Sequence, residues 1–175
     1  MHGHFKVFAL LLSAVVVMAG LSYAHWPEDR LPPNTQADKI LIEKSKRTLT
    51  IFQKGQPLKS YHVALGRQPQ GPKQVEGDKK TPEGNYQIDR KNPDSAFHLA
   101  LHISYPNPSD VQKAKELGAA PGGDILIHGI RNGLGWIGKF QRLFDWTVGC
   151  IAVTNPEIEE LWRVVPVGTP VEIDP

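Results

Sequence analysis

Cysteine is almost absent from this chain, since Cys150 is the only one among 175 residues. A lone thiol cannot form a disulfide within the chain, so Cys150 is either a small buried apolar residue or a reactive group. The chain also lacks an excess of charge of one sign, because its formal net charge is only +2. A nucleic-acid-binding surface needs clustered Lys and Arg on a strongly basic domain, and we therefore expect no nucleic-acid partner.

Long apolar runs are scarce, and the one from Val7 to Leu21 lies close to the N-terminus. It follows a short basic start and precedes Ser22-Tyr23-Ala24, which offers small residues at the positions that a signal peptidase requires. This pattern predicts a secretory signal over residues 1–24 and export to the periplasm or cell envelope, with no stable membrane span after cleavage. An uncleaved anchor is the alternative, although the run is short for a span of about 20 residues.

The rest of the chain has the length and apolar content of one domain with a sizeable core. Residues 25–38 contain three prolines and are interpreted as a linker or a surface-packed leader, with residues 39–175 as the folded domain. Alternating apolar residues predict strands, and capping residues at Ser109 and Asn155 predict two short helices. We expect a mostly β domain with an open, curved sheet or sandwich. The predicted strands are 39–43, 48–53, 58–65, one within 81–88, 97–106, 125–127 and 169–173, and the predicted helices are 109–117 and 155–165.

The surroundings of Cys150 favour a reactive thiol over a packed one. Gly149 precedes it and allows backbone conformations in which successive N–H groups point into one concave site. The predicted strand 125–127 ends at His128 and Gly129, which places an imidazole at a strand end. A cysteine with a histidine far away in sequence is the pattern of a thiol nucleophile and its general base, although a buried structural thiol is the alternative.

These residues predict covalent chemistry on an amide. The Cys150 thiolate attacks the carbonyl to form a thioester, and His128 takes the thiol proton and delivers it to the leaving amine. The backbone N–H groups of Val148, Gly149 and Cys150 are the candidates for an oxyanion hole, in which one donor is typically worth about 3 kcal/mol. We expect the Gly129 carbonyl to orient the imidazole, with the Thr147 hydroxyl as a helper.

Two further histidines invite a metal interpretation, which the local pattern opposes. The alternation from His98 to Ser104 is that of a strand, so His98 and His102 lie about 13 Å apart and cannot bind one ion. We expect no metal and no organic cofactor. His102 and Tyr105 are interpreted instead as substrate-binding residues, together with Trp136 from the glycine-rich spacer 130–146, which is either a packed loop or a lid beside the groove.

Three features together resemble a known family. They are the His128-Gly129 pair followed by Thr147-x-Gly149-Cys150, the sequence Thr-Pro-x-Gly-x-Tyr at 81–86, and the stretch 97–106. They are similar to the L,D-transpeptidase catalytic domain (YkuD-like) family, over residue 39 to the C-terminus, and the wording around Cys150 is nearer to its YafK-like branch. The family usually has an Arg two residues after the cysteine, where this chain has Ala152.

The resemblance implies a fold, a substrate class and a reaction. We expect an exported, cysteine-dependent L,D-transpeptidase that transfers an acyl group from a peptidoglycan stem peptide through a Cys150 thioester to an amine. The partners would be stem peptides, with a cell-wall-linked protein as a second candidate. One alternative is an L,D-carboxypeptidase or a hydrolase that releases protein-linked stems, and another is a non-catalytic peptidoglycan-binding module with an inert thiol.

Overall fold

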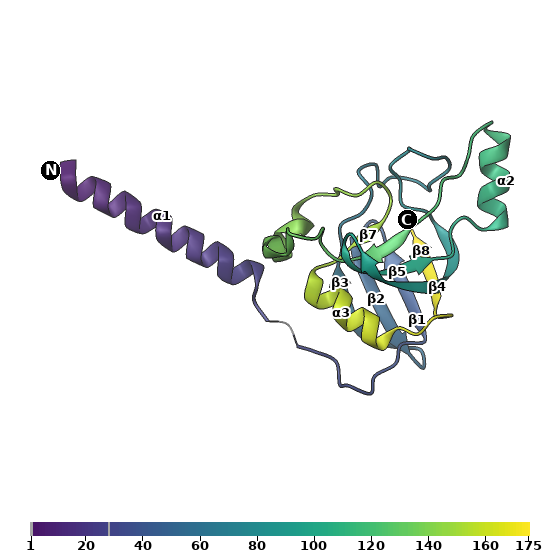
Figure 1. Ribbon diagram of the computed structural model, residues 1–175, viewed down its shortest axis with the longest axis horizontal. Coiled ribbons are helices and arrows are strands. Elements are labelled where there is room, and N and C mark those ends of the chain that lie inside the picture. The colour runs from purple at the N-terminus through teal and green to yellow at the C-terminus, as the bar shows by residue number, and fades with distance from the viewer. Residues whose placement is uncertain (1, 28) are drawn as a thin grey trace.

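A computed structural model describes residues 2–27 and 29–175, with side chains from residue 11 onward. Met1 of the predicted signal segment and Glu28 of the predicted linker lie outside this description. Helix α1 (His2–Ala24) extends away from the body of the molecule, as Figure 1 shows. Among the described residues, no helix combines the length and apolarity that crossing a membrane requires.

The described residues form one sheet of eight strands, in the order β3-β2-β1-β8-β4-β5-β6-β7. Neighbouring strands are antiparallel except for the pairs β1 with β8 and β6 with β7, which are parallel. The strands are β1 (Lys39–Glu43), β2 (Thr48–Gln53), β3 (Gln56–His62), β4 (Gly84–Ser95), β5 (His98–Ile103), β6 (Leu126–His128), β7 (Ile151–Ala152) and β8 (Pro170–Asp174).

The sheet curls so that its two edge strands approach each other. Directly after the edge strand β3, Ala64 forms a bridge with Ala152 of β7, and Gly66 forms another with Thr147. The curl therefore brings a loop from the first half of the chain beside the turn that contains Cys150. The mostly β, curved sheet expected from the sequence is confirmed.

The core lies on the concave side of the sheet, where helix α3 (Asn155–Val164) covers it (Figure 1). Strands β1 and β2 contribute alternating isoleucine and leucine residues that are completely buried, and α3 contributes Ile158 and Leu161. Burying one such side chain contributes about 1.5–3 kcal/mol. Helix α2 (Pro108–Glu116) stands at the end of the domain away from α1.

Both helices have a different capping residue from the one predicted, although α3 begins at the predicted residue. Asn107, not Ser109, caps α2, because its side chain accepts a hydrogen bond from the Asp110 N–H at 3.0 Å and its backbone N–H donates to the Asp110 carboxylate at 2.9 Å. Thr154, not Asn155, caps α3 in the same reciprocal arrangement with Glu157. Serine, threonine and asparagine all suit this position, so the local sequence left neighbouring candidates that only the fold separates.

Strand boundaries agree at the start of the domain and drift later. Strands β1 and β2 have the predicted bounds, whereas β3 covers 56–62 and not 58–65. Residues 63–65 leave the strand because they turn toward the far edge of the sheet, where Ala64 meets β7. The spacer 130–146 contains a 3₁₀ helix that was not predicted, η1 (Gly135–Leu143), with a kink at Gly138.

The predicted linker 25–38 lies against α3 as a packed leader. The backbone N–H of Leu31 donates to Glu160 at 2.6 Å, and Arg163 donates to the carbonyls of Leu31, Pro32 and Pro33. The buried Glu160 carboxylate also accepts from Lys59 and from the Tyr61 hydroxyl. Leader, sheet and helix are therefore joined at one buried carboxylate.

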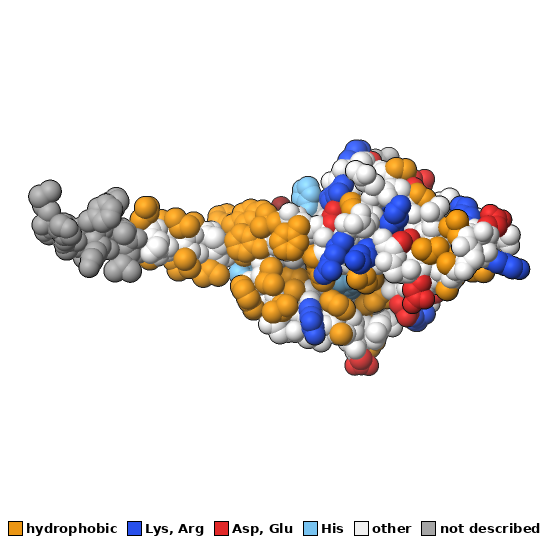
Figure 2. All heavy atoms as spheres, turned by 90° about the horizontal axis from the view of Figure 1, so that it is seen from above, with side chains coloured by type: hydrophobic (Ala, Val, Ile, Leu, Met, Phe, Trp, Pro, Cys, Tyr) orange, Lys and Arg blue, Asp and Glu red, His pale blue; other side chains and the backbone are white. Residues whose placement is uncertain are grey.

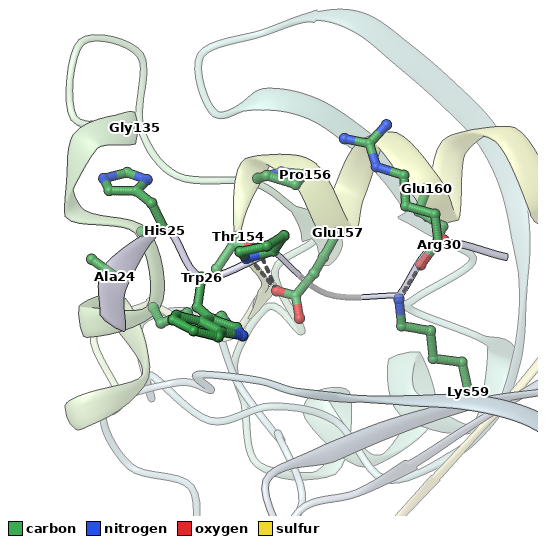
Figure 3. Close-up of a pocket in the computed structure, with 13 residues that line it drawn as sticks. Ala24, His25, Trp26, Arg30, Lys59, Gly135, Thr154, Pro156, Glu157 and Glu160 are labelled. Carbon is green, nitrogen blue, oxygen red and sulfur yellow. Dashed lines mark hydrogen bonds and ion pairs between the residues drawn. The ribbon is translucent and has the colours of Figure 1, made fainter. Parts of the chain in front are cut away.

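The end of α1 packs on η1. Tyr23 and Phe140 lie ring to ring at 5.8 Å, and Gly138 has a φ of 52° with the Ala24 carbonyl so close that an added Cβ would lie 2.3 Å from its oxygen. Figure 3 shows the cavity of about 280 Å³ at this junction, bordered by Ala24, His25 and Trp26 on one side and the start of α3 on the other. In Figure 2 the apolar side chains of α1 run on into those of the domain.

Candidate active site

The parallel pair β6–β7 brings Cys150 and His128 together. Ile127 is paired with Ile151 and His128 with Ala152, so Cys150, one position before β7, lies beside Leu126. Alternate residues of a strand share a face, which puts the thiol and the imidazole on the same side of the two strands, one diagonal step apart. Both side chains line one cavity.

The turn before Cys150 requires its glycine and its threonine. Gly149 has a φ of 137°, and a Cβ there would lie 2.7 Å from the Lys80 carbonyl oxygen, so a larger residue would be strained. The Thr147 hydroxyl accepts from the Gly149 N–H at 3.1 Å and donates to the Cys150 carbonyl at 2.8 Å. The structure therefore places the Thr147 hydroxyl as a brace inside the turn.

The imidazole is held by its neighbour in sequence. His128 Nδ1 donates to the Gly129 carbonyl at 2.7 Å, which leaves Nε2 as a proton acceptor. Gly129 itself is crowded, since a Cβ there would lie 2.8 Å from Asn155 Oδ1. The rings of Phe97 and Trp146 lie 4.5 and 5.7 Å from the imidazole, so the ring has little freedom to turn.

Burial sets the protonation of this pair. It lowers the pKa of His128 to about 4, and the hydrogen bond to Gly129 offsets this only in part. Burial also raises the pKa of the Cys150 thiol, and the Asp124 carboxylate raises it further, while the Leu126 N–H and Lys73 act in the opposite sense. The resting pair at neutral pH is therefore a neutral thiol beside a neutral imidazole, and the imidazole can act as a general base.

Asp124 contacts the thiol from the other side and was missed in the sequence. The Cys150 Sγ donates to the Asp124 carbonyl at 3.5 Å. Asp124 has a φ of 51°, and its carboxylate pairs with Arg90 at 3.0 Å and lies 3.6 Å from His102 Nε2. Nothing in the sequence near Asp124 marks it, because all three neighbours come from distant segments.

The predicted oxyanion donors are not equivalent. Since the Gly149 N–H already donates to Thr147, it does not point into the cavity in this arrangement. The N–H groups of Val148 and Cys150 make no hydrogen bond within residues 2–27 and 29–175. These two remain as donors for a developing oxyanion.

The cavity has a volume of about 490 Å³ and is mostly apolar. One wall comes from the spacer, through Leu134, Ile137, Phe140 and Phe144, and Trp146 lies beside the base. Gln141 of η1 is buried, donates to the Ala152 carbonyl at 3.4 Å and accepts from the Trp146 indole at 3.0 Å. This side chain joins the spacer to β7, and it could not be predicted because glutamine is ordinarily exposed.

The three predicted substrate-binding residues lie elsewhere. His102 is buried, with Nδ1 2.6 Å from Asp89, and the Tyr105 hydroxyl donates to the Pro121 carbonyl at 2.9 Å. Trp136 is 65% exposed on η1, and its carbonyl is hydrogen-bonded to His25. None of the three is among the described residues that line the 490 Å³ cavity.

In the described part of the chain, no group of three or more His, Cys, Asp or Glu residues is placed to hold a metal ion, and His98 pairs with Glu159.

The fold and the sequence of this chain are similar to those of known proteins. Solved structures with the same fold include Pgp2 from Campylobacter jejuni, described as a helical cell shape determining protein, and Bd1075 from Bdellovibrio bacteriovorus. Their TM-scores are 0.57 and 0.55 at 27% and 26% identity, and the matches cover 80% and 83% of this chain but 48% and 53% of those chains. YafK from Escherichia coli (strain K12) is 34% identical over 133 residues, which are 72% of this chain and 46% of YafK.

The curled sheet is thus of the L,D-transpeptidase fold class. The sequence profile of the L,D-transpeptidase catalytic domain, YkuD, matches residues 37–173. The chain belongs to this family, as its sequence motifs predicted. It spans about half the length of YafK and Pgp2.

Proposed function

We propose that the protein is an exported L,D-transpeptidase that uses Cys150 to transfer acyl groups from peptidoglycan stem peptides to an amine. One observation carries this proposal: Cys150 and His128 share a face of β6–β7, and both line one mostly apolar cavity. Family membership supports the substrate class. Residues 1–24 would direct export, and residues 39–175 would form the catalytic domain.

The reaction follows from the resting protonation state. His128 Nε2 takes the thiol proton as Cys150 Sγ attacks the carbonyl carbon of the amide bond before a D-amino acid, and the oxyanion is stabilised by the N–H groups of Val148 and Cys150. The C–N bond then breaks, and His128 gives the proton to the leaving amine. The thioester is finally attacked by an acceptor amine, which passes its proton to His128 and restores the thiol.

A second outcome of the same site is hydrolysis. Water in place of the amine would make the protein an L,D-carboxypeptidase, or a hydrolase that releases protein-linked stems. Ala152, two positions after the cysteine, supports hydrolysis as an alternative. It is fully buried and uncharged, so it cannot bind an acceptor through a salt bridge.

Mass spectrometry of peptidoglycan fragments with tetrapeptide stems separates these possibilities. We expect the full-length chain to produce cross-linked dimers that lack the terminal D-Ala, and the Cys150→Ala variant to produce none. Trimmed monomers without dimers would assign hydrolysis. If neither protein changes free or protein-linked stems and native Cys150 resists iodoacetamide, the protein is a binding module and the catalytic proposal is wrong.

A further inference from the structure

The cavity contains positive charge that the proposed chemistry does not use. Its lining includes two arginines, Arg67 and Arg131, and no aspartate or glutamate. Both side chains are exposed to solvent. An apolar cavity with two guanidinium groups favours a ligand that combines apolar surface with carboxylates, since a guanidinium binds a carboxylate through two parallel hydrogen bonds.

These two arginines have no acidic partner in the described chain, whereas four of the other five arginines do. Within the described residues, neither Arg67 nor Arg131 forms an ion pair. Four of the other five lie within 4.0 Å of a carboxylate, in the pairs Arg47–Asp145, Arg90–Asp124, Arg142–Glu157 and Arg163–Glu160. The fifth, Arg30, lines the separate cavity beside the end of α1. The fold thus satisfies the four paired arginines internally and leaves Arg67 and Arg131 available to a ligand.

Arg67 lies on the nucleophile side. Its backbone N–H donates to the Thr147 carbonyl at 3.0 Å, and its Nε donates to the Trp146 carbonyl at 3.1 Å. The residue is therefore fixed to the turn that holds Cys150, while its terminal nitrogens form no hydrogen bond with residues 2–27 and 29–175. A group bound there would lie next to the acylated carbon.

Arg131 lies on the base side, three residues after His128. Its loop is fixed on both sides, because the Ile130 N–H donates to Asn155 at 2.8 Å and the Asn132 N–H donates to the Ala96 carbonyl at 2.9 Å. His128 protonates the leaving amine, and in a leaving amino acid the carboxylate is only two bonds from that nitrogen. The leaving carboxylate therefore belongs on the side of Arg131.

We propose that Arg131 and Arg67 form a two-sided carboxylate-binding site for the acyl-donor peptide, with Arg131 on the C-terminal carboxylate of the leaving amino acid and Arg67 on a carboxylate of the acyl part. This inference rests on the proposed function and names its donor as a peptide with a free C-terminus. It also supplies from two loops the charge that Ala152 cannot provide.

Binding to the Cys150→Ala full-length chain tests the site without turnover. Titration calorimetry would compare three tetrapeptide stems: the free acid, the C-terminal amide, and a peptide amidated at the internal carboxylate. We expect C-terminal amidation to weaken binding by about 10- to 100-fold, the range for charged hydrogen bonds. Adding Arg131→Gln should weaken the free acid equally, and amidation should then have no further effect. Arg67→Gln should weaken the free acid as much as internal amidation does, and internal amidation should then have no further effect. The effect of C-terminal amidation should persist in this variant.

Two controls separate recognition from bulk charge and from misfolding. Lys115→Gln on the exposed face of α2 changes the net charge equally and should leave all three affinities unchanged, and every variant should keep the parent's melting temperature. Arg131→Lys should recover only part of the affinity, since an ammonium lacks the guanidinium fork.

The outcomes distinguish this proposal from the proposed function. If amidation and Arg131→Gln act additively, or if Lys115→Gln weakens binding as much, the carboxylate site is wrong while the transpeptidase proposal stands. If none of the three peptides binds and the wild-type chain leaves tetrapeptide stems unchanged, both fall together.

Discussion

Strands β1 and β2 differ from strands β6 and β7 in length and regularity. Strands β1 and β2 have five and six residues, carry alternating apolar side chains at Ile40, Ile42, Leu49 and Ile51, and bury these four completely. Strands β6 and β7 have three and two residues and are followed or preceded by residues held in place by hydrogen bonds and glycine. Regular alternation thus supplies the stability, and the short irregular strands supply the reactive groups.

The largest effect that separates these two regions should come from Cys150→Ala. We expect turnover of tetrapeptide stems to fall by about 10⁴-fold or more, as is typical when a covalent nucleophile is lost. The free energy of unfolding should change by less than about 1 kcal/mol, because the side chain is small and only partly buried. Product formation and denaturant unfolding measure the two quantities, and a large loss of stability would mean that the thiol belongs to the core.

The opposite change is Ile42→Ala in β1. Removal of a fully buried isoleucine should lower the free energy of unfolding by about 2–5 kcal/mol. The folded fraction should keep its kcat, since β1 contributes nothing to the cavity lining. Urea unfolding and kcat per folded molecule test this, and a loss of kcat would show that core packing at β1 reaches β7.

A smaller effect is expected from pH, through His128. The imidazole must be neutral to accept the thiol proton, and its pKa is about 4, so kcat/KM should fall as the pH drops through 4. An acid limb near the ordinary value of about 6.5 would contradict this. Circular dichroism over the same range checks that the chain stays folded.

The same pKa has a consequence for stability. His128 is 2% exposed and neutral in the fold, and the unfolded chain binds its proton more readily. Protonation of His128 in the unfolded chain therefore costs the fold nothing above about pH 6.5. It lowers the free energy of unfolding by up to about 3 kcal/mol as the pH falls to about 4. The His128→Gln variant should lose this part of the pH dependence of unfolding, and an unchanged dependence would refute it.

The smallest effect should come from Asp124→Asn. Asparagine also tolerates a positive φ, so the carbonyl that accepts from the thiol stays in place while the carboxylate charge disappears. The pKa of Cys150 should fall, and alkylation by iodoacetamide near pH 8 should become a few-fold faster. Asp94→Asn, on an exposed part of β4, is the matched control and should leave the alkylation rate unchanged.

The same contrast explains what the sequence could predict. Bounds of β1 and β2 were predictable to the residue because side-chain alternation reports local burial. The neighbourhood of Cys150 and His128 followed from motifs. The buried Gln141, the Asp124 contact and η1 were not predictable, because each depends on partners distant in sequence or on a kink at Gly138 that has no periodic signal. His102 was expected at the substrate and lies between Asp89 and Asp124, since strand alternation gives a face but not its partners.

The contact between Ala24 and Gly138 would affect when the predicted signal is cleaved. Ala24 is only 3% exposed, at the end of α1, and its carbonyl lies against Gly138 of η1, so this contact would hinder cleavage of the bond to His25. Cleavage of the predicted signal would therefore be easiest before η1 packs on Ala24. This cleavage would then compete with the folding of η1, and α1 would stay attached where η1 folds first.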